Sequence, residues 1–145
     1  MEVRWAADIL GKPEPKGSTR AFMPKGGRFP VVTSDNPKLK DWQTQIRLVV
    51  TTQVPDLVVE DGPVRLTAVF KLPAPKIVLA HLKRKGLVLP HLTKPDLDKC
   101  LRAILDALTG VSYRDDSQVV AISATKHYAH ADEPPRVWLQ LESER

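Results

Sequence analysis

Cysteine, glycine and long hydrophobic runs are all scarce in this sequence of 145 residues. Its one cysteine, Cys100, excludes an internal disulfide framework and a cysteine-rich zinc site. No apolar run approaches the roughly 18 to 20 residues that a membrane-spanning helix needs, and the charged first residues lack the apolar segment of a signal peptide. Thirteen prolines against seven glycines indicate extended connections. We therefore expect a soluble protein of a reducing, intracellular compartment.

What the sequence does contain is typical of one globular domain over residues 1–145. Hydrophobic residues make up 42% and charged residues 27% of the chain, which argues against a disordered or fibrous protein. A chain of this length can bury a hydrophobic core and is too short for two comfortable domains.

The charges are unevenly distributed, although the net charge of +5 is by itself only a weak indication of an anionic partner. Residues 62–95 contain seven basic residues and no acid, whereas residues 96–116 contain five aspartates and three basic residues. Residues 12–28 are basic again. This distribution allows two interpretations. One is a solvated surface; the other is a carboxylate metal site within a phosphate-binding surface, because carboxylates repel phosphates unless a divalent cation lies between them.

Hydrophobic periodicity predicts an α+β domain with a mixed or antiparallel sheet and two main helices. The predicted elements are strands at 2–9, 63–72, 119–128 and 136–142, a hairpin at 20–33, and helices at 37–52 and 97–108. Residues 73–93 show no sustained period and contain three prolines and the basic run Lys83, Arg84 and Lys85. They predict a long, mobile basic loop, with a helical turn at 77–82 as the alternative; such a loop is uncommon in compact domains unless it is functional or disordered.

Two aspartates separated by one residue, Asp96 and Asp98, stand where the second helix is expected to begin. On a regular helix their side chains would point about 200° apart, so they share one side only where the backbone is extended. Pro95 disfavours helix for the residue before it and can itself only open one. Either one aspartate caps the helix and the other is solvated, or the two are metal ligands at a helix N-terminus.

A second acidic pair, Asp115 and Asp116, follows the same helix in a short turn. Taken alone it is a turn sequence, because Asp and Ser are frequent turn residues. If the strand after it returns beside the helix start, three carboxylates converge, which suits Mg²⁺ or Mn²⁺. On the helix itself, Arg102 either holds a phosphate or forms an intrahelical ion pair with Asp98 or Asp106.

The sequence KPDLDKCLRAILDALTGV at 94–111, followed by YRDDSQVV at 113–120, resembles the RusA family of Holliday junction resolvases. The segments PKGSTRAF at 15–22 and KHY at 126–128 are similar to the family as well. The resemblance covers most of the chain and leaves residues 73–93 and the tail outside it. It implies a RusA-like, homodimeric fold and a small Mg²⁺-dependent endonuclease of bacteria or phages, hence a cytoplasmic protein.

The resemblance also implies roles for individual residues. The family's metal carboxylates fall on Asp96, Asp98 and Asp116, and its basic catalytic residue, usually Lys, falls on Arg102. The family commonly has Asn where this chain has Lys99. The basic residues expected to contact DNA are Lys16, Arg20, Lys83, Arg84, Lys85, Lys94 and Lys99.

The function implied is Mg²⁺-dependent, structure-specific cleavage of four-way junction DNA by paired phosphodiester hydrolysis, in recombination and repair. Two alternatives stay open. Because this chain has Lys99 where the family commonly has Asn, one alternative is a non-catalytic protein that binds branched DNA through a degenerate active site. A small phosphatase with an Asp nucleophile would need an apolar strand before Asp96, and residues 91–95 are a poor one.

Overall fold

The computed structural model describes residues 1–17, 19–34, 36–85 and 88–144, and for residues 19–22, 31–34 and 83–85 it describes the backbone alone. The elements follow in the order β1 (Glu2–Leu10), β2 (Thr19–Phe22), β3 (Val31–Ser34), α1 (Leu39–Gln53), β4 (Val64–Leu72), α2 (Lys76–Lys85), α3 (Leu97–Leu108), the 3₁₀ turn η1 (Asp116–Gln118), β5 (Val119–Tyr128) and β6 (Arg136–Ser143). Among these residues, none of the helices is long and apolar enough to cross a bilayer.

The described strands form one main sheet and one separate hairpin. The main sheet has the order β1-β6-β4-β5, in which β6 pairs antiparallel with both β1 and β4. The last pair, β4 with β5, is parallel. β2 and β3 pair only with each other. The predicted α+β class with a mixed sheet is therefore confirmed.

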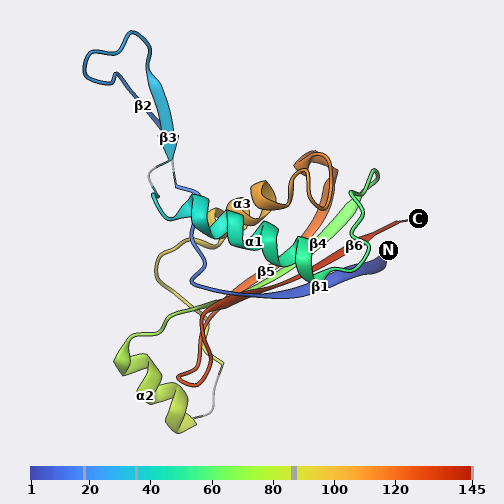
Figure 1. Cartoon of the computed structure of the whole chain (residues 1–145). Coiled ribbons are helices and arrows are strands. Elements are labelled where there is room, and N and C mark those ends of the chain that lie inside the picture. The colour runs from blue at the N-terminus through green and yellow to red at the C-terminus, as the bar shows by residue number, and fades with distance from the viewer. Residues whose placement is uncertain (18, 35, 86–87, 145) are drawn as a thin grey trace.

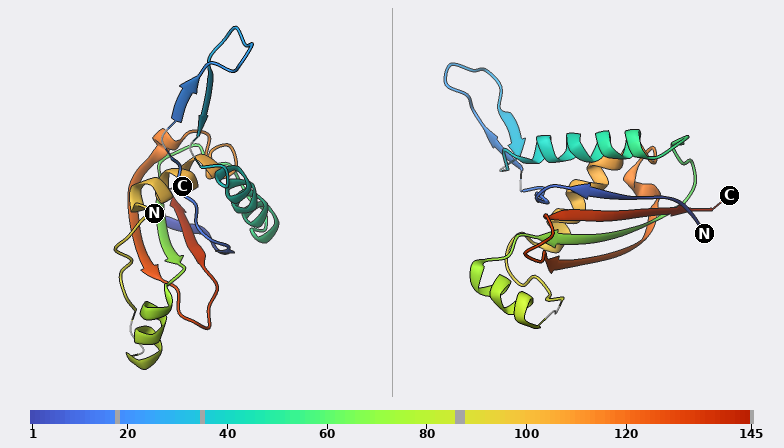
Figure 2. Two further views of the ribbon diagram at one scale, coloured as in Figure 1. Left: turned by 90° about the vertical axis from the view of Figure 1, so that its left-hand side faces the viewer. Right: turned by 60° about the horizontal axis from the view of Figure 1, so that its bottom comes forward.

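Helices α1 and α3 cover one face of the main sheet (Figure 1). The β2–β3 hairpin and α2 extend from the end of the sheet opposite to the two termini, the hairpin on the side of α1 and α2 on the other side, as the right-hand view of Figure 2 shows. The molecule thus has a layered body and two projections that lie on opposite sides of it.

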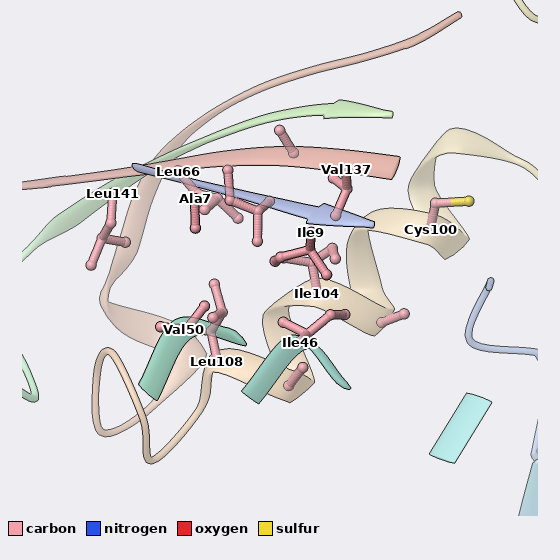
Figure 3. Close-up of a cluster of buried hydrophobic side chains, with 14 of the residues drawn as sticks. Ala7, Ile9, Ile46, Val50, Leu66, Cys100, Ile104, Leu108, Val137 and Leu141 are labelled. Atoms are coloured by element: carbon pink, nitrogen blue, oxygen red, sulfur yellow. The ribbon is translucent and has the colours of Figure 1, made fainter. Parts of the chain in front are cut away.

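The core lies between the sheet and the two covering helices (Figure 3). Alternate residues of β1 point into it, as the burial of Trp5, Ala7 and Ile9 shows. In α1 the buried residues recur at spacings of three and four, which gives one apolar stripe. Gly11 follows β1 with a φ of +136°, and a Cβ there would lie 2.9 Å from the Trp42 ring, so only glycine lets the chain pass this close to α1.

Helix α3 fully buries only Ile104 and Leu108 of its apolar stripe, whose other members are Leu97, Leu101 and Leu105, and it adds small residues to the buried face. Its buried residues are Cys100, Ala103, Ile104, Ala107 and Leu108, whereas its first three leucines are only partly buried. The small side chains of Cys100 and the two alanines let the helix approach α1 and the sheet closely. This packing leaves the polar side of α3 on the surface, where it carries Asp98, Arg102 and Asp106.

The predicted loop over 73–93 is wrong for residues 76–85, which form α2. The two prolines before the helix suit its start, where no amide hydrogen is needed, and the Leu79 N–H donates to the Pro75 carbonyl oxygen at 2.9 Å. Burial of Leu82, which is 1% exposed, anchors the helix. The basic run at 83–85 therefore forms the last turn of a helix.

Candidate acidic site along helix α3

Asp96 and Asp98 lie at the N-terminus of α3 with exposed side chains. Asp96 occupies the N-cap position in an extended conformation, with φ −68° and ψ 142°, yet its side chain makes no capping hydrogen bond. Asp98 lies in the first turn of the helix. The capping interpretation of Asp96 therefore finds no hydrogen bond to support it, and its carboxylate oxygens are available to a ligand.

The chain that leads into Asp96 is held by a lysine of a neighbouring strand. The Nζ atom of Lys126, in β5, donates to the carbonyl oxygens of Thr93 at 2.7 Å and Pro95 at 2.9 Å. The register of the sheet places Lys126 opposite Phe70, which is fully buried. Sequence reasoning missed this role, although a lysine at an inward-facing position of a strand is a signal that could have revealed it, because such a charge needs partners.

The N-terminal loop crosses α3 and is fastened to it at Lys16. The Lys16 N–H donates to the Lys99 carbonyl oxygen at 3.0 Å, and the Lys16 ammonium group forms an ion pair with Asp106. Both side chains in this pair are 36% exposed. Lys16, predicted to bind DNA, is therefore also a tie between the loop and the helix.

Asp115 and Asp116 have different roles in the turn before β5. The Asp115 carboxylate accepts from the Ser117 N–H at 2.9 Å, which lowers the pKa of Asp115, and the Gln118 side chain accepts from the Asp115 N–H at 3.0 Å. This capping box fixes the turn. The adjacent Asp115 carboxylate is the main cause of a raised pKa for Asp116, to which desolvation and the negative charge of Asp106 add.

Asp96 and Asp116 line two different clefts beside α3. The larger, of about 460 Å³, is lined by Asp96, Lys94 and Lys99 together with the N-terminal loop. The smaller, of about 230 Å³, is lined by Lys16, Leu105 and the polar residues Arg102, Asp106 and Asp116. Asp116 thus lies beside the middle and the second half of α3, near Arg102, Leu105 and Asp106.

The convergence of Asp96, Asp98 and Asp116 on one cation stays a prediction. Among the residues that the structure describes, no three His, Cys, Asp or Glu side chains are grouped closely enough to hold a metal ion. Carboxylate oxygens are nevertheless the donors that Mg²⁺ and Mn²⁺ prefer, and the raised pKa of Asp116 shows acidic neighbours whose repulsion a cation would relieve. The donor chemistry fits such an ion.

The remaining predicted residues are distributed around these clefts. Arg102 is exposed, and within the described part of the chain it forms no ion pair with Asp98 or Asp106, so the intrahelical pairing is not found. Lys99 Nζ lies 3.9 Å from the Asp96 carboxylate. The backbone of Arg20 lies in β2 and that of Lys83, Arg84 and Lys85 in α2, and their side chains lie outside the described part.

Burial raises the pKa of the Cys100 thiol to about 12, which makes it an inert core residue.

Exposed carboxylates lie beside basic side chains along one helix of this small α+β domain. The family model described as Endodeoxyribonuclease RusA matches residues 12–142, and the chain belongs to this family. The resemblance found in the sequence is thereby confirmed. A similar protein of Bacillus subtilis (strain 168), Uncharacterized protein YqaN, is 34% identical over 138 residues, which cover 92% of this chain and 92% of that protein.

Proposed function

We propose that this protein is a Mg²⁺-dependent endodeoxyribonuclease that resolves four-way DNA junctions by paired phosphodiester hydrolysis, in recombination and repair. The observation that carries the proposal is the family match over residues 12–142, because it includes the whole acidic segment and the basic N-terminal loop. The exposed carboxylates along α3 support it, since an enzyme needs such groups unoccupied by capping or core contacts.

In this proposal Asp96, Asp98 and Asp116 hold the divalent cation. When bound, such an ion lowers the pKa of a coordinated water and offsets negative charge on the phosphate that is attacked. The protein's own contribution is to hold the acids and to bind the DNA backbone. Lys126 fixes the chain before Asp96 through two carbonyl oxygens. Arg102 is exposed and lines the smaller cleft with Asp116, which supports its proposed contact with the phosphate that is cut.

The remaining basic residues are proposed to bind the phosphates on either side of the cut. Lys94 and Lys99 line the larger cleft next to Asp96. Arg20 belongs to the hairpin, and Lys83, Arg84 and Lys85 belong to α2, so these contacts lie on the two projections of the molecule (Figure 2). Binding that depends on many phosphate contacts weakens steeply with salt, because each contact releases condensed counterions.

A junction requires two symmetric cuts, and a twofold homodimer with one site in each subunit would supply them. We propose this assembly for the protein, together with a cytoplasmic location in a bacterium or a phage-infected cell.

A non-catalytic protein that binds branched DNA is the second candidate. Two observations favour it: Lys99 lies within 3.9 Å of Asp96, where its charge competes with a cation, and the described acids do not form a three-ligand group. A phosphatase is less well supported, because residues 91–95 are irregular and do not form the strand that would present an Asp nucleophile.

The test uses the purified full chain with a synthetic four-way junction and a linear duplex of the same sequence, with and without Mg²⁺. We expect paired nicks in the junction alone, abolished by EDTA. Junction binding without nicks in Mg²⁺ or Mn²⁺ would favour the second candidate and overturn the first. Hydrolysis of a small phosphate ester, with no nicking, would indicate the phosphatase.

A further inference from the structure

The larger cleft has a lining that the proposed chemistry does not explain. A cation site needs a few carboxylates, whereas this cleft of about 460 Å³ also has four prolines in its walls and three lysines. The prolines are Pro13, Pro15, Pro37 and Pro95, and the lysines are Lys12, Lys94 and Lys99. With Glu14 and Asp96 as its acids, the lining carries a net positive charge.

The cleft is built by hydrogen bonds that tie the N-terminal loop to the rest of the domain. The Asn36 side-chain amide donates to the Glu14 carboxylate and to the Pro15 carbonyl oxygen, both at 3.0 Å. A little further along, the Lys16 N–H donates to the Lys99 carbonyl oxygen at 3.0 Å. Because the loop is held on both sides, the cleft exists before any ligand arrives.

The chemistry of this lining matches a nucleotide. Proline rings offer flat apolar surfaces of the kind on which a base packs, and lysine ammonium groups attract its phosphates. The volume is within the range of pockets that hold molecules of this size. Asp96 in the wall places the bound nucleotide next to the proposed reaction site.

We infer that this cleft binds one unpaired nucleotide of the cut strand, adjacent to the phosphate that is hydrolysed. The base packs among the prolines and the flanking phosphate lies against Lys12 and Lys94. Extruding a base costs least where its pairing is weak, and in this inference that base lies at the branch point of the junction. The cleft would therefore help to select branched over linear DNA. This inference rests on the proposed function, since it requires DNA to occupy the acidic site.

The experiment measures binding without hydrolysis, in Ca²⁺ or EDTA. Junctions carry a tetrahydrofuran abasic analogue at one position at a time around the branch point, and a second series carries 2-aminopurine. We expect one position at which removing the base weakens binding about fivefold or more, and at which 2-aminopurine fluorescence changes on binding as the base leaves its stack.

The double variant Lys12→Ala with Lys94→Ala should lose this position dependence, because both side chains are exposed and line the cleft. Lys76→Ala removes an exposed lysine of α2 and is the matched control, which should keep it. Equal affinity for every abasic junction, or a 2-aminopurine that stays stacked in the complex, would overturn the inference. A selective abasic effect without any cleavage in Mg²⁺ would support the cleft and overturn the nuclease, so the two failures are distinguishable.

Discussion

The two clefts beside α3 contain similar residues and use them differently. In the larger one, Asp96 makes no capping hydrogen bond, and its distance of 3.9 Å from Lys99 Nζ is at the limit of an ion pair. In the smaller one, Asp106 is paired with Lys16, and Asp116 lies beside the Asp115 carboxylate. Asp96 in the larger cleft is open to a ligand, whereas Asp106 in the smaller one already ties the N-terminal loop to α3.

This difference teaches that charge alone does not identify a reactive group along one helix. Changing a carboxylate that secures a loop lowers the stability of the protein. Changing a carboxylate that is open to a ligand lowers its activity without lowering its stability. Substitutions in the two clefts should therefore separate the two properties.

Asp96→Asn should have the largest effect of all. We expect cleavage of a junction in Mg²⁺ to fall a hundredfold or more, because the lost charge is worth several kcal/mol to a cation-assisted transition state. Junction affinity and thermal unfolding should be unchanged. The control is Asp132→Asn, at an exposed aspartate of the β5–β6 connection. Nicking assays with gel-shift titrations measure both properties, and normal cleavage by Asp96→Asn would remove Asp96 from the site.

Lys126→Met should affect both properties, because Lys126 supports the larger cleft from within the sheet. Two carbonyl oxygens lose a charged donor, which should lower the free energy of unfolding by about 1 to 3 kcal/mol. Cleavage should fall further than stability accounts for, since the chain before Asp96 is released. Lys126→Arg should recover part of the stability and part of the cleavage. Lys76→Met should leave stability and cleavage unchanged. Urea denaturation that shows no loss for Lys126→Met would contradict this support.

The ion pair of the smaller cleft should give a moderate effect. Lys16 and Asp106 are each 36% exposed, so a double-mutant cycle with Lys16→Met and Asp106→Asn should give a coupling free energy of up to about 1 kcal/mol. The coupling should shrink in high salt. A coupling indistinguishable from zero at low salt would show that Lys16 is free for DNA and that the two clefts do not differ in this way.

A smaller effect should come from His91, in the segment that leads to the larger cleft. Its ring is 5% exposed and lies 4.7 Å from that of Tyr128. Burial and the positive charge of Lys126 lower the pKa of His91 from its usual value of 6.5. His91 therefore binds a proton near pH 6.5 in the unfolded chain and only at lower pH in the folded chain. The free energy of unfolding should fall as the pH drops below 6.5.

His91→Phe removes the titrating group and keeps an aromatic ring against Tyr128. We expect the wild type to lose stability relative to the variant as the pH falls from 7.5 to 5.5. The free energies of unfolding of the two proteins, measured over this range, give the difference. A difference that is constant over this range would mean that His91 does not titrate between the two states.

Much of the body was predictable because periodicity reports burial directly. Strand β5 begins and ends where the pattern places it, and α3 likewise. The burial of Ala103 and Ala107 in α3 was not predictable, since leucines are more apolar than alanine, and only the close approach of α1 makes the small residues the buried ones. Helix α2 was missed because ten residues flanked by prolines show too few turns to establish a period.

The candidate site shows the same limit. The acids could be found from their spacing, because two carboxylates at a proline-marked helix start form a local pattern. Their distances from one another are set by the path of the N-terminal loop and by the turn before β5, which are tertiary features. For this reason the pairing of Asp106 with Lys16, and the support from Lys126, became visible only in the structure.

The parallel pairing of β4 with β5 ties solubility to activity. Parallel neighbours need a connection that returns to the starting end of the sheet, and here that connection contains α3 and η1, hence Asp96, Asp98, Asp106, Asp115 and Asp116. If this segment unfolds, β5 loses its anchorage and β4 is left with an unpaired backbone edge, which is a template for aggregation. A molecule whose acidic helix has come apart would thus be removed from solution instead of persisting as a DNA-binding competitor of intact copies.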